Sequence, residues 1–348
     1  MLHPGAGTST VSVVARMTSL MSSRQKRLIN VDEVPSKTPS VAPVGLTAKL
    51  REWMGYFRNH IGHTLRAGQE VAALEADLEE YDRELRGHSG ISLAEARVLE
   101  IGFGTRAARL ALLNARAQDV LGVDPEVPML TWDLATLRRI GASNGWERAA
   151  KTTVRYLLFD RSFKRALTDA VGRNGQQLRY GRMEFCDAAD LELPEASVDL
   201  VVSEDVLEHM SVESLTRMLA KLRRWLGADG LALLRPNVFT GISGGHLAEW
   251  DTVGVVSDPF RHRHSRPWGH LLEEDIQPNT YLNRLSRQDY RDAFRSAGLQ
   301  ILEERPRHPD LGRSLLIPQL KDELRHWPDE ELFSNQVLFV LKATEGAR

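Results

Sequence analysis

Cysteine is nearly absent from this sequence of 348 residues, and so is any long apolar run. The single cysteine, Cys186, excludes an internal disulfide and a thiolate-built zinc site, and it suits a reducing compartment such as the cytoplasm. No apolar run approaches the roughly 18 to 20 residues that a membrane helix needs, so we expect a soluble protein with no membrane span. The formal net charge of −2 gives no global field that favours nucleic acid or an anionic membrane surface.

Acidic residues are missing from residues 1–31, and residues 1–45 hold prolines among Ser and Thr without an apolar period. This composition predicts a disordered leader over 1–45. An organelle transit peptide has a similar composition, but no secretory apolar core is visible. Over 46–90 apolar residues recur at helical spacing, which predicts an N-terminal helical extension of one or two helices. Such an extension could pair two copies of the chain as a homodimer.

Between residues 91 and 345, short β-rich runs alternate with helical stretches, the order that builds a parallel sheet covered by helices. The predicted strands are 97–101, 119–123, 181–185, 198–203, 231–235, 299–303 and 336–342. The segments 131–178 and 236–285 are too long for simple connections, and we expect them to be inserts in this domain. The first contains one predicted helix, about 146–172, with basic side chains on one face: Arg148, Lys151 and Arg155. A further helix is expected to open at Ser286.

The stretch RVLEIGFGTRAAR, residues 97–109, reads as a strand, a glycine turn and the start of a helix. Gly102 and Gly104 leave room for a ligand to approach backbone N–H groups at a positive helix end. About twenty residues on, the second predicted strand ends in Asp124, where a carboxylate can accept both hydroxyls of a ribose. The order of these features predicts a nucleoside cofactor.

Two classes of nucleoside cofactor fit this turn. Gly102, Gly104 and Ala107 also satisfy the dinucleotide fingerprint, so an NAD(P)-dependent oxidoreductase stays open as an alternative. Glu100, in the last turn of the strand, favours the other class, because its carboxylate would repel a pyrophosphate and attract the ammonium group of S-adenosylmethionine.

Four segments resemble the class I S-adenosylmethionine-dependent methyltransferases across about residues 95–240. RVLEIGFGT is similar to their first motif and LGVD to their ribose-binding strand end. EFCDAADLELPEASVDLVVSEDVLEH is similar to their third strand through the segment after the fourth. The resemblance implies an α/β fold with a doubly wound, mostly parallel seven-stranded sheet, helices on both faces, a reversed last strand and a Rossmann-like methyltransferase domain over 91–345.

The resemblance also implies which residues contact S-adenosyl-L-methionine. Glu100, Gly102 and Gly104 line the methionine end and Asp124 the ribose. Asp187 and Ala188 contact the adenine. Glu204 and Asp205 lie beside the methyl group.

Arg106 departs from the family pattern, because it stands where a third glycine is usual. TRAARLALL predicts a helix from Thr105 onward, in which an arginine carries no backbone strain. Its side chain would then point to solvent or reach the cofactor carboxylate. A non-catalytic binding module with a methyltransferase fold is the alternative in which Arg106 marks a decayed site.

The acceptor is the least determined part of the prediction. SEDVLEHM, after the fourth strand, lacks the Asn/Asp-Pro-Pro-aromatic motif of amino-methylating relatives, and Cys186 lies on the wrong strand for cytosine C5 methylation. An oxygen nucleophile with a histidine base is therefore favoured. The catalytic candidates are His246, His209 and Asp205, although structural roles compete for both histidines.

Three further groups of candidates lie mostly in the segment 236–285. His262, His264 and His270 form a second histidine cluster. The carboxylates that suit magnesium are Glu204, Asp205, Glu249 and Asp251, but no spacing is diagnostic, and we predict no metal. The aromatic residues that could stack on an acceptor or form a core are Trp250, Trp268 and Tyr281.

The sequence therefore predicts a cytoplasmic S-adenosylmethionine-dependent O-methyltransferase. PWGHLLEEDIQPNTYLNRLSRQDYRDAF resembles the region after the fifth strand in bacterial methyltransferases of cell-surface glycan and natural-product pathways. This favours a hydroxyl of a sugar-containing compound or secondary metabolite as acceptor, and not nucleic acid.

Overall fold

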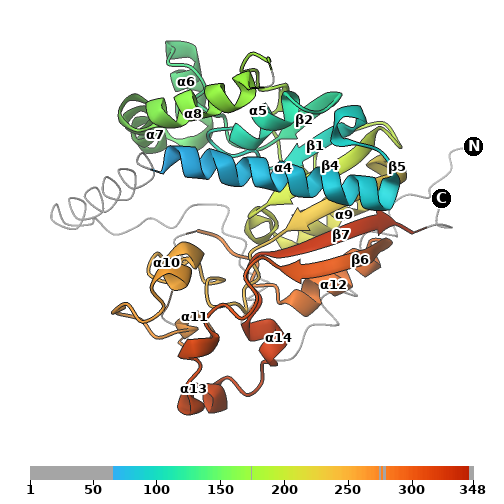
Figure 1. Ribbon diagram of the computed structural model, residues 1–348. Coiled ribbons are helices and arrows are strands. Elements are labelled where there is room, and N and C mark those ends of the chain that lie inside the picture. Colours follow the sequence, from blue (N-terminus) through green and yellow to red (C-terminus); the bar gives the residue numbers. More distant parts are fainter. Residues whose placement is uncertain (1–65, 174, 274–275, 277–279, 345–348) are drawn as a thin grey trace, which may run out of the picture. The chain divides into compact units, whose positions relative to one another are not determined.

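The computed structural model describes residues 66–173, 175–273, 276 and 280–344 (Figure 1). These residues fall into two units, divided after Cys186. The predicted leader, 1–45, and the part of the helical extension before residue 66 lie outside the described residues.

Residues 66–186 contain three parallel strands, β1 (Arg97–Ile101), β2 (Asp119–Val123) and β3 (Arg182–Glu184). β1 and β2 are buried along almost their whole length, as expected for strands covered on both faces. Both have the predicted bounds, and β3 is slightly shorter than predicted.

The helices of this unit are α4 (Ala67–Ser89), η1 (Leu93–Glu95), α5 (Ala108–Asn114), α6 (Leu134–Asn144), α7 (Trp146–Leu158) and α8 (Asp160–Gly172). α4, the long blue helix of Figure 1, packs against α5 and α8. Its buried face includes Val71, Leu78 and Leu85, at multiples of seven residues. This apolar face packs against other helices of the same chain. The predicted homodimer stays a prediction.

The predicted single helix over 146–172 is wrong, because the helix breaks at Phe159. Phe159 has φ −121° and ψ −29°, outside the helical range, and its side chain is buried. Across the break, the Arg155 guanidinium donates to the carboxylate of Asp160, at 3.1 Å, and to the hydroxyl of Thr105, at 2.8 Å. Arg155 is thus an internal partner and not part of a solvated basic face. The side chains of Arg148 and Lys151 lie outside what the structure describes.

Residues 187–344 contain four strands, β4 (Val198–Glu204), β5 (Leu226–Arg235), β6 (Leu299–Pro306) and β7 (Val337–Ala343). β4 and β5 are parallel, whereas β7 is antiparallel to both β5 and β6. The reversed last strand is therefore confirmed. β5 begins earlier and β6 ends later than predicted.

The helices of this unit are η2 (Leu207–His209), α9 (Val212–Trp225), α10 (Thr252–Ser257), α11 (Gly269–Leu272), α12 (Arg287–Ser296), η3 (Arg313–Leu315), α13 (Pro318–Glu323) and α14 (Asp329–Leu332). α12 starts as predicted, since Ser286 is its N-cap and forms a capping box with Asp289. α9 packs against β5 and α12 against β6.

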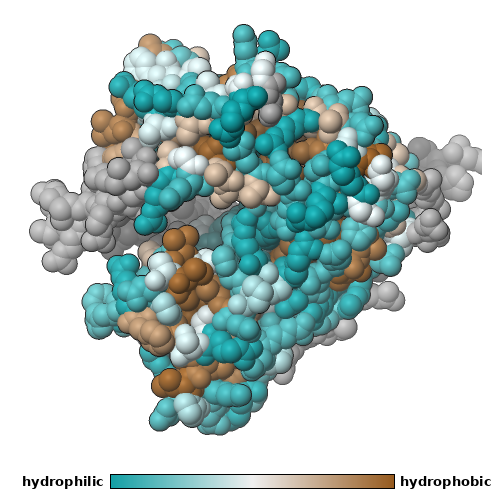
Figure 2. Space-filling view, viewed as in Figure 1, coloured by the Kyte–Doolittle hydropathy of each residue, from teal (hydrophilic) through white to brown (hydrophobic). Residues whose placement is uncertain are grey.

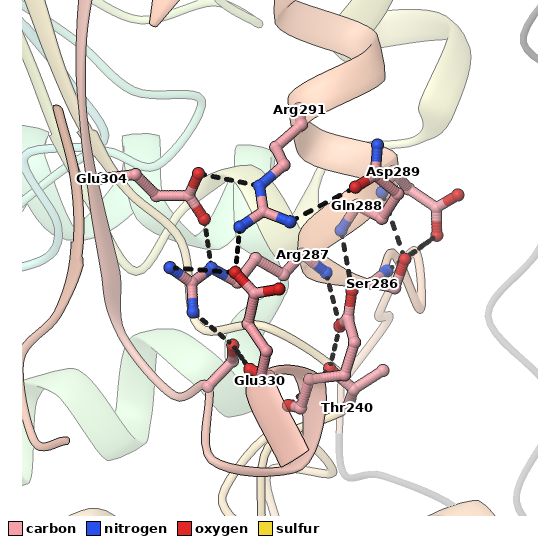
Figure 3. A network of polar contacts seen from close by, with 10 residues as sticks. Thr240, Ser286, Arg287, Gln288, Asp289, Arg291, Glu304 and Glu330 are labelled. Carbon is pink, nitrogen blue, oxygen red and sulfur yellow. Dashed lines mark hydrogen bonds and ion pairs between the residues drawn. The ribbon is translucent and has the colours of Figure 1, made fainter. Parts of the chain in front are cut away.

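The first turn of α12 is held by a polar network (Figure 3). Arg287 and Arg291 both donate to the carboxylate of Glu304, on β6. The carboxylate of Glu331, in α14, accepts from the backbone N–H of Arg287 at 2.9 Å and from the hydroxyl of Thr240 at 2.7 Å. The network thus ties four segments of this unit together: α12, β6, α14 and the segment that holds Thr240.

The predicted insert 236–285 shares a hydrophobic cluster with the segment between β6 and β7. α10, α11, α13 and α14 gather in one part of this unit (Figure 1). The buried members of the cluster are Ile242, Trp250, Val255, Trp268, Leu311, Leu320, Leu324, Leu332 and Phe333. Trp250 and Trp268 therefore have the core role that competed with acceptor stacking.

Part of the surface of this unit is apolar at α10. The helix buries Val255 but leaves Val253 and Val256 60% and 54% exposed, and Figure 2 shows hydrophobic residues over this helix.

The strand order is β3-β2-β1-β4-β5-β7-β6. The chain thus has the predicted α/β fold with a mostly parallel seven-stranded sheet. Among the described helices, none combines the length and the apolar character needed to cross a bilayer.

Candidate functional site

The glycine turn follows β1 directly. Gly102 and Gly104 have φ of +78° and +66°, in the left-handed region that favours glycine. The N–H of Gly102 donates to the carbonyl of Val123 at 2.8 Å, which continues the pairing of β1 with β2. The turn is therefore built as the sequence predicts, on the backbone freedom of two glycines.

Asp124 anchors this turn from the end of β2. One carboxylate oxygen accepts from the N–H of Gly104 at 2.8 Å, and the other accepts from the N–H of Glu126 at 2.7 Å. Each oxygen has a second lone pair, so these bonds leave capacity for ribose hydroxyls. The predicted ribose contact is compatible with this geometry and stays a prediction.

Glu100 is 1% exposed and faces an arginine of the protein itself. The guanidinium of Arg109, on α5, lies 3.5 Å from the Glu100 carboxylate and 3.5 Å from that of Asp77, on α4. A buried carboxylate needs such a cation to offset its desolvation. Whether Glu100 also attracts the ammonium of the cofactor stays a prediction.

The helix predicted to start at Thr105 begins instead at Ala108. The left-handed conformation falls on Ala107, with φ 45°, and Arg106 is not among the residues with positive φ. The Arg106 guanidinium donates to Asp160 at 2.9 Å and to Glu70 at 3.3 Å, and it lies 4.5 Å from the centroid of the Phe163 ring. The predicted solvent-pointing side chain is therefore wrong, because internal carboxylates hold Arg106, whereas its predicted reach to the cofactor stays a prediction.

Asp187 and Ala188 open the second unit. Asp187 is exposed, and its carboxylate accepts from the N–H of Ala189 at 2.8 Å and from the hydroxyl of Ser214, on α9, at 2.6 Å. Ala188 is buried. The predicted adenine contact thus falls on a turn that α9 fixes, and it stays a prediction.

Glu204 and Asp205, at the end of β4, have different surroundings. The side chains of Glu204 and Arg235 are each 3% exposed, and Arg235 donates to both carboxylate oxygens at 3.0 and 3.1 Å. Asp205 is exposed, has φ +54° and accepts from the side-chain amide of Gln336. The predicted methyl-side contacts of both residues stay predictions, and Glu204 also has a structural partner.

His209 and His246 lie together, although 37 positions separate them in the sequence. Their rings pack edge to face with centroids 4.9 Å apart. Beside them is Glu208, whose Oε1 atom lies 3.7 Å from Nε2 of His246. Glu208 was missed by the sequence analysis; a carboxylate adjoining a candidate histidine, directly after a buried strand, is the signal that could have found it.

Burial shifts the protonation of this group of residues. Burial, and then the charge of Asp205, raise the pKa of Glu208 well above its ordinary value. Burial, and then the proximity of His209, lower the pKa of His246 to about 4. His246 therefore favours its uncharged form at neutral pH, and Glu208 holds its proton more strongly than an ordinary glutamate does.

The loop that carries His246 is tightly packed, not glycine-flexible as expected. A Cβ atom on Gly244 would lie 2.2 Å from the carbonyl oxygen of Val238, and one on Gly245 would lie 2.5 Å from the ring of His270. His246 itself has φ +51°. These glycines are needed because other groups approach the backbone closely, which fixes the position of His246.

The second predicted histidine cluster is only partly formed. His262 and His264 have ring centroids 5.6 Å apart. Nε2 of His270 instead donates to the carbonyl of Phe239 at 2.8 Å, and burial lowers its pKa to about 4. His270 therefore belongs to the packing of the His246 loop.

The other predicted candidates of this segment have local partners. Glu249 accepts from the N–H groups of His264 and Ser265, and Asp251 caps α10. Trp250 donates to Ser265 at 2.9 Å and has the guanidinium of Arg263 4.4 Å from its ring. Tyr281 is 56% exposed. Only Tyr281 of the three aromatic candidates offers an open ring.

The sequence matches the family described as Methyltransferase domain over residues 73–304. The chain belongs to this family. It is an S-adenosylmethionine-dependent methyltransferase by class, and S-adenosylmethionine is its cofactor, as the sequence predicted. No curated protein matches the sequence.

Several solved structures are similar at low identity. A TehB-like methyltransferase from Corynebacterium glutamicum is 14% identical, with a TM-score of 0.36, over 82% of this chain and 99% of its own. The 1,6-didemethyltoxoflavin N1-methyltransferase of Burkholderia thailandensis is 13% identical, with a TM-score of 0.38, over 90% and 98%. A Mesorhizobium loti methyltransferase is 14% identical, with a TM-score of 0.38, over 74% and 94%. Likenesses this remote say nothing about the acceptor.

Proposed function

We propose that this methyltransferase methylates a hydroxyl oxygen of a small molecule, either a sugar-containing compound or another secondary metabolite. The observation that carries the proposal is the grouping of Glu208 and His209, which follow β4, with His246, which follows β5. Asp205 is on the same short segment as Glu208. In the in-line displacement the oxygen bonds to the methyl carbon while the sulfur–carbon bond breaks, and the hydroxyl proton must leave. The neutral imidazole of His246 has a nitrogen lone pair that can receive that proton.

Two features support the accompanying assignments. The net charge of −2 supports a small-molecule or glycan acceptor over nucleic acid, and the single cysteine supports a cytoplasmic location. The family match favours methyl transfer over the NAD(P)-dependent alternative.

Cofactor binding is tested by calorimetry with S-adenosylhomocysteine. We expect micromolar affinity for the wild type and a loss of at least 100-fold in Asp124→Ala, because the Asp124 carboxylate holds the turn and is the proposed ribose acceptor. Asp119→Ala, at the exposed start of the same strand, is the matched control and should bind normally. Tight binding of NADH in place of S-adenosylhomocysteine would reject the proposal, and no binding of either would favour a non-catalytic module.

The transfer itself is tested by screening hydroxyl compounds with methyl-labelled cofactor and locating the label by NMR. His246→Ala should bind S-adenosylhomocysteine but lose at least 100-fold in turnover, whereas His264→Ala, at an exposed histidine, should turn over normally. Label on nitrogen or carbon would disprove O-methylation, and normal turnover of His246→Ala would remove that residue from the mechanism.

A further inference from the structure

Glu208, His209 and His246 form a compact set of donor atoms from two segments of the chain. One ligand atom of each residue lies within 4.8 Å of those of the other two. The Glu208 oxygen and the His246 Nε2 nitrogen are 3.7 Å apart. A tetrahedral ion with bonds near 2.1 Å separates its ligand atoms by about 3.4 Å. Small movements of the three side chains are therefore enough to place all three ligand atoms around one ion.

Glu208 lacks the cation that a buried carboxylate normally has. Its side chain is 4% exposed, and among the described residues its oxygens face only the backbone N–H groups of Glu208 and Asn237, without a hydrogen bond of good geometry, and the ring of His246. The nearby Glu204 is about equally buried but has the guanidinium of Arg235 as its cation. Metal binding requires the deprotonated carboxylate and releases its proton, so an ion here would supply the positive partner that Glu208 lacks.

The surroundings orient both imidazoles. Nδ1 of His209 donates to the carbonyl of Tyr281 at 3.0 Å, which leaves the Nε2 lone pair of the neutral ring available to a ligand. A histidine that binds a metal typically has its other ring nitrogen held by a carbonyl or carboxylate in this way. The side-chain amide of Asn283 fixes the turn that carries Glu208 and His209, donating to the carbonyls of Leu207 at 2.7 Å and Met210 at 3.2 Å.

His246 is held from the opposite segment. Its backbone has φ +51°, and Gly245 before it packs under the ring of His270. The Asn237 amide nitrogen lies 3.3 Å from Nε2 of His246, a contact that must give way when an ion binds. Strained backbone of this kind is typically kept at functional sites.

We propose that Glu208, His209 and His246 bind one divalent transition-metal ion, with Zn²⁺ as the ion that best suits the ligands. Two imidazole nitrogens and one carboxylate oxygen are a common ligand set of catalytic zinc, whereas Mg²⁺ and Ca²⁺ prefer oxygen ligands. The side chain of His246 is 21% exposed, so a fourth coordination position can face a small ligand. The sequence analysis predicted no metal, because no spacing among its candidate ligands was diagnostic, and Glu208 was not among those candidates.

Occupation of the fourth position by an acceptor hydroxyl rests on the proposed function. A bound metal lowers the pKa of an oxygen ligand and so favours release of its proton. In that case the metal and not the ring of His246 would prepare the acceptor oxygen. Metal binding itself does not depend on methyl transfer.

The test is a Co²⁺ and Zn²⁺ titration of the full chain after dialysis against a chelator. We expect one equivalent of Co²⁺ to give the visible absorption of a four- or five-coordinate ion, and one equivalent of Zn²⁺ to displace it. Glu208→Gln and His246→Ala should each weaken binding at least tenfold. His264→Ala, in the exposed His262–His264 pair, should bind as the wild type does.

The inference is overturned if the wild type shows no saturable site, or if Glu208→Gln and His246→Ala bind as tightly as the wild type. Should these variants fail to fold, X-ray absorption of the zinc-loaded wild type decides, with two imidazole ligands expected and none contradicting the site. Calorimetry with S-adenosylhomocysteine separates the two proposals. Cofactor binding without metal binding rejects only the metal site, and metal binding without methyl transfer rejects only the proposed function.

Discussion

Buried carboxylates lie at the ends of β1 and β2 and at and just after the end of β4, and they differ in their partners. Asp124 accepts two backbone N–H groups, and Glu100 faces Arg109. At the end of β4, Glu204 has Arg235, whereas Glu208 is about as deeply buried with no arginine or lysine beside it among the described residues. The glycine turn is thus held by its own chain, and Glu208 is where the proposed metal would supply a positive partner.

The largest expected effect contrasts the two buried glutamates. Glu204→Ala should lower the free energy of unfolding by about 3 to 5 kcal/mol, because it leaves Arg235 buried without its carboxylate. Glu208→Gln should cost far less, since it replaces a carboxyl group that has no arginine or lysine partner with an amide of the same shape. Urea denaturation monitored by circular dichroism measures both. Equal costs would remove the distinction between a paired and an unpaired carboxylate.

The next effect is a pH dependence from His270, which packs beneath the His246 loop. Its pKa is about 4 in the folded chain against an ordinary 6.5, so the unfolded chain binds the proton first as the pH falls. Its stabilisation is complete above pH 6.5 and is lost progressively down to pH 4. The loss amounts to about 3 kcal/mol at most.

His270→Gln keeps a donor for the Phe239 carbonyl but cannot titrate. Its free energy of unfolding should therefore fall less steeply than that of the wild type between pH 6.5 and 4, with the His246 contribution remaining in both. Urea unfolding at pH 7, 5.5 and 4.5 gives the comparison. Identical pH profiles would show that His270 is not held neutral by burial.

A smaller effect is expected from Arg106, on the glycine-turn side of the comparison. Arg106→Ala removes the guanidinium bonds to Asp160 and Glu70 and should cost about 2 kcal/mol of stability. Arg182→Ala, which breaks an exposed pair with Asp119, should cost about 1 kcal/mol or less. Affinity for S-adenosylhomocysteine should stay within about twofold in Arg106→Ala. A large loss of affinity with unchanged stability would show that Arg106 serves the cofactor instead.

The smallest change in the free energy of unfolding is expected for two glycines that both have positive φ. They should differ in their effect on cofactor binding. Gly104→Ala and Gly90→Ala should each cost about 1 kcal/mol, because both have positive φ and open space for a Cβ atom. Only Gly104→Ala should weaken S-adenosylhomocysteine binding, since only that turn is proposed to approach the cofactor closely. Thermal unfolding and calorimetry check the pair. Equal affinities would place the cofactor away from Gly104.

The sequence predicted best what depends on local pattern. β1 and β2 follow from short apolar runs with a glycine turn and an acid at their ends, and Ser286 marks the start of α12 by its side chain. The sequence predicted least well those features that depend on contacts between residues far apart in the chain. Arg106 is fixed by Asp160, 54 positions away, and the break at Phe159 depends on burial rather than on a proline or glycine.

The candidate site divides in the same way. Its candidates at the ends of β1 and β2 belong to two short motifs, so position alone was enough to predict them. Glu208 gains its importance from His246, which reaches it only because Gly244 and Gly245 allow a close-packed turn. No periodicity or motif spacing in the sequence predicts that these two side chains lie together.

The shared core of segments 236–285 and 307–336 limits how either segment can be exchanged between relatives. A chimera that replaces only the first segment would set foreign side chains against Leu311, Leu320 and Phe333. Core packing tolerates such mismatches poorly. The two segments form one packing unit. We therefore expect a chimera to fold when both segments come from the same relative.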